Sequence, residues 1–432
     1  MAHTKTFLTQ PAVPVIPAKA GIQSPAAATS LDSRLRGNDA ASPQQQRLFF
    51  LDWLRILAFA LLVPYHVGMY YVSWDWHVKS AAASTVIEPL MMLSSPWRLS
   101  LLFFIAGAAS QALLRKSAGQ GFVRQRSRQL LWPLLFGMLV IVPPQAYYEV
   151  VTKVAYAGSY LDFMQLYVQA YHGFCRGTDC LILPTWNHLW FLPYLWIYSM
   201  LGWALVRHAA TPLDGLAERL GRCQPWQLLL IPALPVLASR LLADHFPGTN
   251  NLVWDWYNHA QYLSVFLLGL LCARSGNALW DGMRLVRWPA LLLSVLGWAW
   301  LAGAFRAWEA GVPHWVFLLA FGALKWWAIV AACGFARQHL NVDSAARRAL
   351  TPAIFCVYIL HQTVIVGLTR LLLPLHMPPL VEGLSLIVLT FAICAAGYLL
   401  AREVPGLRLV LGINKPAVKP PQSRQFNPGL SP

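Results

Sequence analysis

Arg55 and His66 are two ionisable side chains of the first apolar segment, and their spacing could serve chemistry. They lie eleven residues apart in the run LDWLRILAFALLVPYHVG. At about 100° and about 1.5 Å per residue, a helix would place both on nearly the same face and separate them by about 16 Å along its axis. A guanidinium binds phosphate well, and an imidazole is the usual general base for a hydroxyl. This face therefore suits a long substrate with an anionic end and a distant reacting end.

Each of the two residues also has a structural interpretation. Asp52 lies three positions before Arg55, where a carboxylate and a guanidinium on one helix pair readily. His66 has no such neighbour in its own segment, but a hydrogen bond from another helix would account for it. Pro64 lacks a backbone N–H and should loosen the helix just before His66. The two residues alone leave both interpretations open.

The elements that position these side chains should be membrane-spanning helices. The 432-residue chain is 57% hydrophobic and only 12% charged, which is too apolar for a water-exposed globular surface. Runs of about 20 mostly apolar residues recur along it. The sequence therefore predicts an all-α fold, a polytopic membrane helical bundle. We expect about ten transmembrane helices, at 48–72, 90–114, 129–150, 188–206, 226–244, 260–274, 288–304, 314–334, 350–372 and 380–401.

The two ends of the chain differ from this apolar region. Residues 1–46 are rich in Pro, Ala, Ser and Gln without helical periodicity, so we expect a disordered N-terminal extension. Residues 402–432 follow the last apolar run and are expected to form a cytoplasmic tail. The membrane domain expected between them, 47–401, contains its longest connection at 151–187, which is aromatic. This connection is expected to hold an interfacial helix or a lid.

Basic residues are distributed unevenly between the two sides of the predicted bundle. An even number of helices places both termini on one side, which then carries 24 Lys and Arg against 7 on the other. An excess of positive charge marks the cytoplasmic side of a membrane protein. We therefore expect both termini in the cytoplasm. The net charge of +16 reflects this asymmetry, and nucleic acid is not an expected partner.

The seven cysteines do not resemble a metal framework, and we expect no metal site. Five of them are scattered singly over predicted helices or a cytoplasmic loop: Cys223, Cys272, Cys333, Cys356 and Cys394. Cys175 and Cys180 differ, because they lie in the long outer loop at C-x4-C spacing. An oxidising compartment would allow a disulfide between them. Two free thiols, and less simply a metal site, are the alternatives.

Five motifs, taken in chain order, resemble the acyltransferase 3 family of integral membrane acyltransferases. They are the R-x10-H spacing of Arg55 and His66, LLFFIAGAAS at 101–110, the basic stretch Arg124 to Arg128 before Pro133, His188-Leu189-Trp190-Phe191-Leu192, and Tyr358-Ile359-Leu360-His361. The resemblance covers 47–401 and is strongest to the branch that succinylates periplasmic glucans. Gln129 departs from the family pattern, which usually has arginine there. The resemblance therefore assigns that arginine's role to Arg126 and Arg128.

The resemblance implies transfer of an acyl group from cytoplasmic acyl-CoA to a hydroxyl, commonly of a glycan, on the periplasmic side of a bacterial inner membrane. Arg55, Arg126 and Arg128 would hold the phosphates of CoA, and His66 would be the general base or a proton shuttle. The partners implied are the lipid bilayer, acyl-CoA and a glycan acceptor. A transporter or flippase with an intramembrane Arg/His pathway is the alternative, although the sequence shows no internal repeat of the kind many transporters have.

His188 and His361 complete the catalytic set that the resemblance implies, and each has a structural alternative. His188 lies beside two tryptophans, as an interfacial residue of an aromatic belt would. His361 lies near the middle of a predicted helix, where an interhelical hydrogen bond would explain it. Lys325 is expected to snorkel toward the cytoplasm and Arg98 to anchor the outer end of the second helix. Their alternatives are a contact to CoA and a contact to a polar acceptor.

Overall fold

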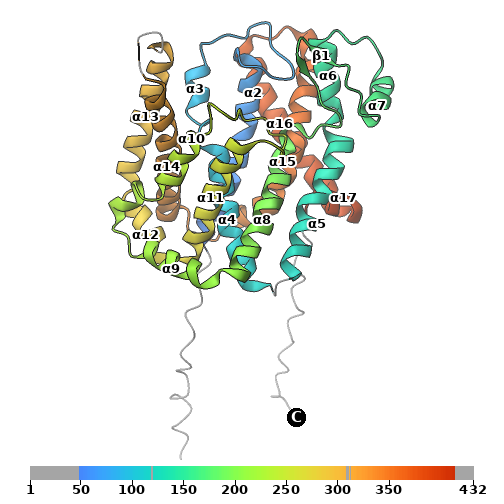
Figure 1. The fold of residues 1–432 in the computed structure, drawn as a ribbon. Coiled ribbons are helices and arrows are strands. Elements are labelled where there is room, and N and C mark those ends of the chain that lie inside the picture. The colour runs from blue at the N-terminus through green and yellow to red at the C-terminus, as the bar shows by residue number, and fades with distance from the viewer. Residues whose placement is uncertain (1–47, 118–119, 308–310, 312, 414–432) are drawn as a thin grey trace, which may run out of the picture. The chain divides into compact units, whose positions relative to one another are not determined.

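The computed structural model describes residues 48–117, 120–307, 311 and 313–413. The expected extension 1–46 and the end of the expected tail lie outside these ranges. The described residues fold mainly as helices (Figure 1), which confirms the predicted helical membrane bundle. The α-helices are α1 (Phe49–Ala60), α2 (Leu62–Tyr71), α3 (Glu88–Met92), α4 (Arg98–Lys116), α5 (Gln120–Phe136), α6 (Pro143–Lys153), α7 (Tyr160–Val168), α8 (Phe191–His208), α9 (Ala210–Gly221), α10 (Ala233–Arg240), α11 (Trp256–Arg274), α12 (Asn277–Leu285), α13 (Arg287–Ala307), α14 (His314–His339), α15 (Ala345–Leu372), α16 (Pro379–Glu403) and α17 (Pro405–Val410).

Six helical segments of the described residues are long and apolar enough to cross a membrane, or up to eight if each of two bent pairs forms one span. The sequence predicted about ten. The six segments are Phe49–Tyr71, Arg98–Lys116, Asn187–His208, His314–His339, Ala345–Leu375 and Pro379–Glu403. The bent pairs are Gly121–Ile141 with Pro143–Lys153, at 42°, and Trp256–Arg274 with Asn277–Leu285, at 112°.

One predicted span, 226–244, is wrong as a single helix. The chain there forms a 3-10 segment, η3 (Pro225–Leu229), and the eight-residue α10. Pro232 and Pro235 explain the interruption, because proline lacks an N–H donor and its ring clashes with the preceding turn of a helix. The mean hydropathy of a sequence window does not detect that prolines break a helix.

The first span is formed by α1 and α2 and carries Asp52, Arg55 and His66. The structure gives the first two of these residues partners on α15. The carboxylate of Asp52 accepts from Nη1 of Arg347 at 2.5 Å, and Nη2 of Arg55 donates to the carbonyl of Thr351 at 3.3 Å. These contacts fasten the beginning of α1 to the beginning of α15, which carries His361 further along.

Helices α4 and α11 approach each other at two glycines. A Cβ atom built on Gly107 would lie 1.9 Å from the carbonyl oxygen of Phe266, and one built on Gly269 would lie 1.9 Å from the carbonyl oxygen of Phe104. Only a residue without a side chain permits such backbone contact, as in other tightly packed membrane helices. The two glycines therefore fix the separation of the helices that carry Arg98 and Tyr262.

The connection predicted at 151–187 contains α7 and a small hairpin of β1 (Cys175–Arg176) and β2 (Asp179–Cys180). Ser159 and Asp162 form a capping box at the start of α7, which satisfies backbone N–H groups of its first turn. Cys175 and Cys180 are joined as a disulfide, as the sequence predicted. The predicted helix in this connection is confirmed, whereas its action as a lid stays a prediction.

Candidate active site

Three neighbouring cavities are lined by Arg55, Arg126 and Arg128 at one end and by His66 and His188 at the other. We call them the basic cavity, of about 650 Å³, the neck, of about 160 Å³, and the histidine cavity, of about 580 Å³. Gln129 and Gly412 line both the basic cavity and the neck. Leu102 and Phe191 line both the neck and the histidine cavity. Shared walls make the three spaces adjacent, in this order.

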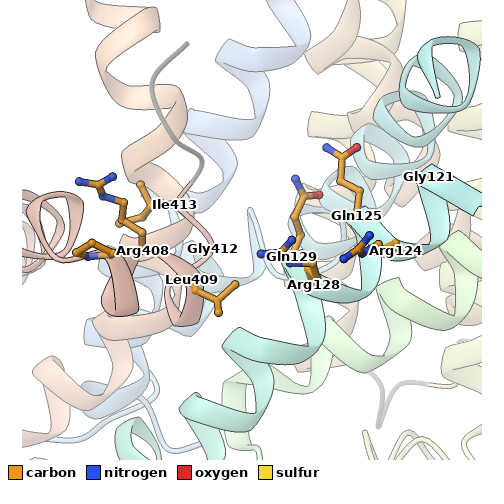
Figure 2. A pocket seen from close by; sticks show the side chains of 10 residues that line it. Gly121, Arg124, Gln125, Arg128, Gln129, Arg408, Leu409, Gly412 and Ile413 are labelled. Carbon is orange, nitrogen blue, oxygen red and sulfur yellow. The ribbon is translucent and has the colours of Figure 1, made fainter. Parts of the chain in front are cut away.

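The basic cavity lies between α5 and α17. Figure 2 shows its lining side chains coming from α5 on one side, including Arg124 and Arg128, and from Arg408 to Ile413 on the other. Arg408 also donates to the carbonyl of Arg402 at 2.5 Å, which covers the end of α16 and holds α17 in place. The cavity therefore presents positive charge between the third predicted span and the chain that follows the last one.

The neck is lined by two of the arginines that the sequence singled out, Arg55 and Arg126. Both line this cavity, and Nη2 of Arg126 donates to Oγ of Ser110 on α4 at 2.7 Å. Arg128 lies two positions further along α5 and lines the basic cavity instead. The structure thus brings Arg55 and Arg126 together and places Arg128 in the adjoining space. The three guanidinium groups thus line two adjoining cavities.

His66, His361 and Tyr358 form a chain of hydrogen bonds beside the histidine cavity. Nδ1 of His66 lies 2.9 Å from Nε2 of His361, and Nδ1 of His361 lies 2.7 Å from the backbone carbonyl oxygen of Tyr358. The carbonyl only accepts, so Nδ1 of His361 carries a proton. In neutral His361, Nε2 then accepts, and Nδ1 of His66 must be the donor.

The same series of hydrogen bonds determines which ring nitrogen of His66 carries the proton. With its proton on Nδ1, neutral His66 has a lone pair on Nε2, which is the form a general base requires. His66 is partly buried and lines the histidine cavity, and its ring stacks on that of Trp76 at a centroid separation of 6.4 Å. The geometry therefore fits a base whose tautomer is set by its neighbour.

His188 is buried and is held differently. Its Nε2 lies 3.0 Å from the carbonyl oxygen of Ile359 and therefore donates, which leaves Nδ1 to accept from Nε2 of Gln145 at 3.4 Å. The hydroxyl of Tyr358 donates to the carbonyl of His188 at 2.8 Å. Both ring nitrogens are engaged, so His188 shapes the wall of the histidine cavity.

His77 also lines this cavity and is bonded to the carboxylate of Glu149, and neither residue was singled out from the sequence. Nδ1 of His77 donates to the Glu149 carboxylate at 2.5 Å, while Nε2 of Gln362 lies 2.6 Å from Nε2 of His77. Lys153 also donates to Glu149, at 2.8 Å. Glu149 fell within a predicted span, and an acidic residue there is a signal that could have identified it. His77 lies in a connecting loop and gave no such signal.

The loop of residues 72–87 brings His77 and Trp76 to the cavity. Nζ of Lys79 donates to the carbonyls of Met69 and Trp74, at 2.6 and 2.9 Å. Burial of the Lys79 ammonium group away from water lowers its pKa. The N–H of Ser73 donates to Glu88 at 3.0 Å at the start of α3. Internal hydrogen bonds thus fold the loop back over the end of α2.

Arg98 and Lys325 differ from their expected roles. Arg98 is 5% exposed and lines the histidine cavity, so it is not an interfacial anchor. Lys325 is 2% exposed and donates to the side chain of Gln261, so it does not snorkel to the membrane surface. Both predictions assumed that a long basic side chain reaches water, whereas packing encloses each one.

Among the described residues, no group of three or more His, Cys, Asp or Glu could hold a metal ion.

Comparison with known families identifies the arrangement. A family model described as an acyltransferase domain, that of the acyltransferase 3 family, matches residues 48–399 and therefore most of the chain. The chain belongs to this family. It is thus a membrane acyltransferase, and the family favours an enzyme over the transporter considered from the sequence. The match runs from the beginning of α1 almost to the end of α16, and so includes His66, His188 and His361.

Curated relatives match a smaller part of this acyltransferase. Glucans biosynthesis protein C of Escherichia coli strain K12 and that of Escherichia coli O1:K1 / APEC are each 28% identical over 100 residues. The aligned part covers 23% of this chain and 26% of each relative, so the chain spans about a quarter of the length of the relatives it matches. No solved structure matches the acyltransferase significantly.

Proposed function

We propose that this acyltransferase takes its acyl group from acyl-CoA, held in the basic cavity and the neck, and transfers it to a hydroxyl bound in the histidine cavity. The observation that carries the proposal is the adjacency of the three cavities. Arginines line the two spaces at one end, and a histidine with an available lone pair lines the third. A nucleotide phosphate and a thioester lie at opposite ends of an acyl-CoA, which suits this order.

The chemical step follows from the tautomer of His66. Nε2 accepts the proton of the acceptor hydroxyl while the oxygen attacks the thioester carbonyl, so that a C–O bond forms. The tetrahedral intermediate then collapses, the C–S bond breaks, and His66 returns the proton to the sulfur of CoA. His361 accepts from Nδ1 of His66 throughout, which stabilises the imidazolium in the orientation of the neutral ring.

A carbohydrate is the proposed acceptor. The histidine cavity is lined by the rings of Trp76, Trp186 and Trp190 and by the amides of Asn187 and Asn250. Flat aromatic rings pack against the apolar faces of sugars, and amides exchange hydrogen bonds with their hydroxyl groups. The name of the relatives, glucans biosynthesis protein C, agrees with an acceptor of this class. We extend that class to this chain as part of the proposal.

The test separates the base from the phosphate contact. Replacing His66 with Ala should lower turnover by roughly 10² to 10⁴ with little change in acyl-CoA affinity, because a base acts mainly in the transition state. Arg55→Ala should instead weaken acyl-CoA binding, since a charge-assisted hydrogen bond is lost. Purified protein would be assayed for CoA release with a glucan acceptor and by calorimetry for acyl-CoA binding. Exposed His208→Ala and Arg222→Ala are the matched controls.

Two results would remove the assignment. One is a folded His66→Ala protein that transfers acyl groups at the normal rate. The other is a folded Arg55→Ala protein that binds acyl-CoA normally. Thermal unfolding of each variant decides whether it is folded, because Arg55 also contacts α15 through Thr351.

We also propose that the basic cavity faces the cytoplasm. The basic residues of the cavity support this orientation, since Arg124, Arg128 and Arg408 line it and an excess of positive charge marks the cytoplasmic side of a membrane protein. Reporter fusions after residue 120, at the beginning of α5, should then report cytoplasm, and fusions near residue 165, within α7, should report periplasm. The reverse pattern would contradict the orientation and with it the direction of transfer.

A further inference from the structure

Gln362 is a buried residue of α15 that follows His361, and its side chain lines the histidine cavity. Its amide nitrogen Nε2 has two polar neighbours. It lies 2.6 Å from Nε2 of His77 and 3.1 Å from Oε1 of Gln145. The nitrogen of an amide only donates and its oxygen only accepts. The orientation of the Gln362 amide therefore depends on whether these two neighbours are acceptors.

His77 is an acceptor toward Gln362. Nδ1 of His77 donates to the carboxylate of Glu149, which only accepts. The ammonium group of Lys153 lies 2.8 Å from the same carboxylate and neutralises it, so the bond does not require a charged imidazole. In neutral His77, Nε2 then carries a lone pair, and it accepts a hydrogen bond from Nε2 of Gln362.

Gln145 is an acceptor toward Gln362 for a separate reason. The hydroxyl of Thr363 donates to the carbonyl of Ile141 at 2.6 Å, so the Thr363 oxygen accepts from Nε2 of Gln145, also at 2.6 Å. Oε1 of Gln145 is therefore an acceptor, and it bonds Nδ2 of Asn187 at 3.2 Å as well as Nε2 of Gln362. Both N–H groups of Gln362 are thus used, and only its Oε1 is left.

Oε1 of Gln362 is an unused acceptor at the histidine cavity. It accepts no hydrogen bond from the described residues, and protein does not enclose it, in contrast to the buried, unpartnered Oε1 of Gln111. The cavity is lined by three further side-chain amides, and each has its oxygen engaged within the described residues: Oδ1 of Asn187 accepts from Thr185, that of Asn250 from Asn258, and that of Asn258 from Gln261. Nε2 of His66 and Oε1 of Gln362 thus remain, among the described lining side chains, as free atoms that accept and cannot donate.

We propose that Oε1 of Gln362 binds a second hydroxyl of the acceptor while Nε2 of His66 takes the proton of the reacting hydroxyl, an inference that rests on the proposed function. Two such atoms in one cavity match a substrate that presents two hydroxyl donors, since each hydroxyl can rotate its hydrogen toward an acceptor. Gln362 thereby selects a polyol over an alcohol with a single hydroxyl and fixes which hydroxyl meets His66. His77 and Gln145 are positioning residues, because they hold the amide in this orientation.

The experiment measures CoA release by the full-length protein with acetyl-CoA as donor. The acceptors are methyl β-glucoside and its four monodeoxy forms, each of which lacks one hydroxyl. The form without the reacting hydroxyl should give no product. One other form should have a kcat/KM lower by roughly 5- to 150-fold, because the Gln362 oxygen then loses its hydrogen bond. The remaining forms should stay within a few-fold of the parent glucoside.

Gln362→Leu should lower kcat/KM for the parent glucoside by the same factor and leave the sensitive deoxy form unchanged, because the hydroxyl and the amide oxygen act as a pair. A merely structural role would lower kcat/KM for all acceptors alike. Gln111→Leu removes a buried amide that lines none of the three cavities, and as the matched control it should keep the full difference. His77→Phe leaves the amide held by Gln145 alone and should reduce the difference. If Gln362→Leu does not fold, the deoxy forms tested on the unaltered protein and on His77→Phe decide the question.

A binding measurement separates this inference from the proposed function. Methyl β-glucoside should raise the thermal unfolding temperature of the unaltered protein more than at least one of its deoxy forms does, and Gln362→Leu should lose that difference. Equal kcat/KM for every deoxy form that reacts, or an equal loss for parent and deoxy forms in Gln362→Leu, would overturn the inference. Failure to release CoA with any acceptor would contradict the proposed function, while the unfolding temperatures would still report on Gln362.

Discussion

His361 should set the catalytic form of His66, and this role gives a quantitative prediction. Phe at position 361 keeps an aromatic ring in the bundle but removes the nitrogen that lies 2.9 Å from Nδ1 of His66. The N–H of His66 then loses its acceptor, at a cost of about 1 to 3 kcal/mol for a buried unpaired donor. The proton can avoid this cost by moving to Nε2, which leaves no lone pair facing the cavity.

The same magnitude gives the expected rate. A penalty of about 1 to 3 kcal/mol on the active tautomer lowers turnover by roughly 5- to 150-fold, since 1.4 kcal/mol is a factor of ten. CoA release under saturating donor and acceptor measures turnover, and thermal unfolding confirms that the variant is folded. Acyl-CoA affinity should stay unchanged, because His361 is remote from the basic cavity lined by Arg124 and Arg128. His361→Gln restores an acceptor and should recover part of the loss.

A double-mutant cycle makes the prediction stricter. If His361 acts through His66, then His361→Phe should have little further effect on a protein that already carries His66→Ala, because residues that act as a unit are strongly non-additive. Additive losses would refute the reasoning, as they would show that His361 contributes independently of His66. A folded His361→Phe protein with normal turnover would refute it as well.

Two further predictions concern structure rather than chemistry. Gly269→Ala should lower the thermal unfolding temperature and the turnover, because the added Cβ would lie 1.9 Å from the carbonyl oxygen of Phe104 and force α4 and α11 apart. Overpacking of this kind costs about 1 to 3 kcal/mol. Gly367→Ala is the control, because nothing lies within 4 Å of its added Cβ, and it should change neither quantity. A comparable loss in Gly367→Ala would contradict the argument. Cys175 and Cys180 should be oxidised in membranes prepared with free thiols blocked. Labelling of both by a maleimide without prior reduction would contradict the disulfide.

The fold class was predictable because lipid imposes a simple constraint. A membrane span must satisfy its backbone internally and be apolar over its length, and both properties are visible in a sliding window of sequence. The window failed at 226–244, where Pro232 and Pro235 interrupt an apolar run and the structure has η3 and α10. The window also predicted a single span at 129–150, whereas the structure has two helical segments there, bent by 42° between Ile141 and Pro143.

The candidate site was predictable only in part. Arg55, Arg126 and the three histidines were found because helical spacing and family motifs are local in sequence. Partners that lie far along the chain were not, as the bond between Asp52 and Arg347 joins residues 295 positions apart. The burial of Arg98 and Lys325 likewise depends on which helices surround them. The spacing of residues on one helix predicts which face of that helix a side chain occupies. It does not predict which residues of other helices the side chain contacts.

The neck has a consequence for the membrane itself. If the donor and the acceptor reach the protein from opposite faces, as we propose, they need a passage through the bilayer, and a water-filled passage would dissipate the ion gradients that the cell maintains. The neck holds only about 160 Å³, and apolar side chains such as Phe59, Leu102 and Phe355 form much of its wall. Arg55 and Arg126 add an electrostatic barrier to cations at the same level. The pair proposed to bind phosphate would thus also insulate the membrane between turnovers.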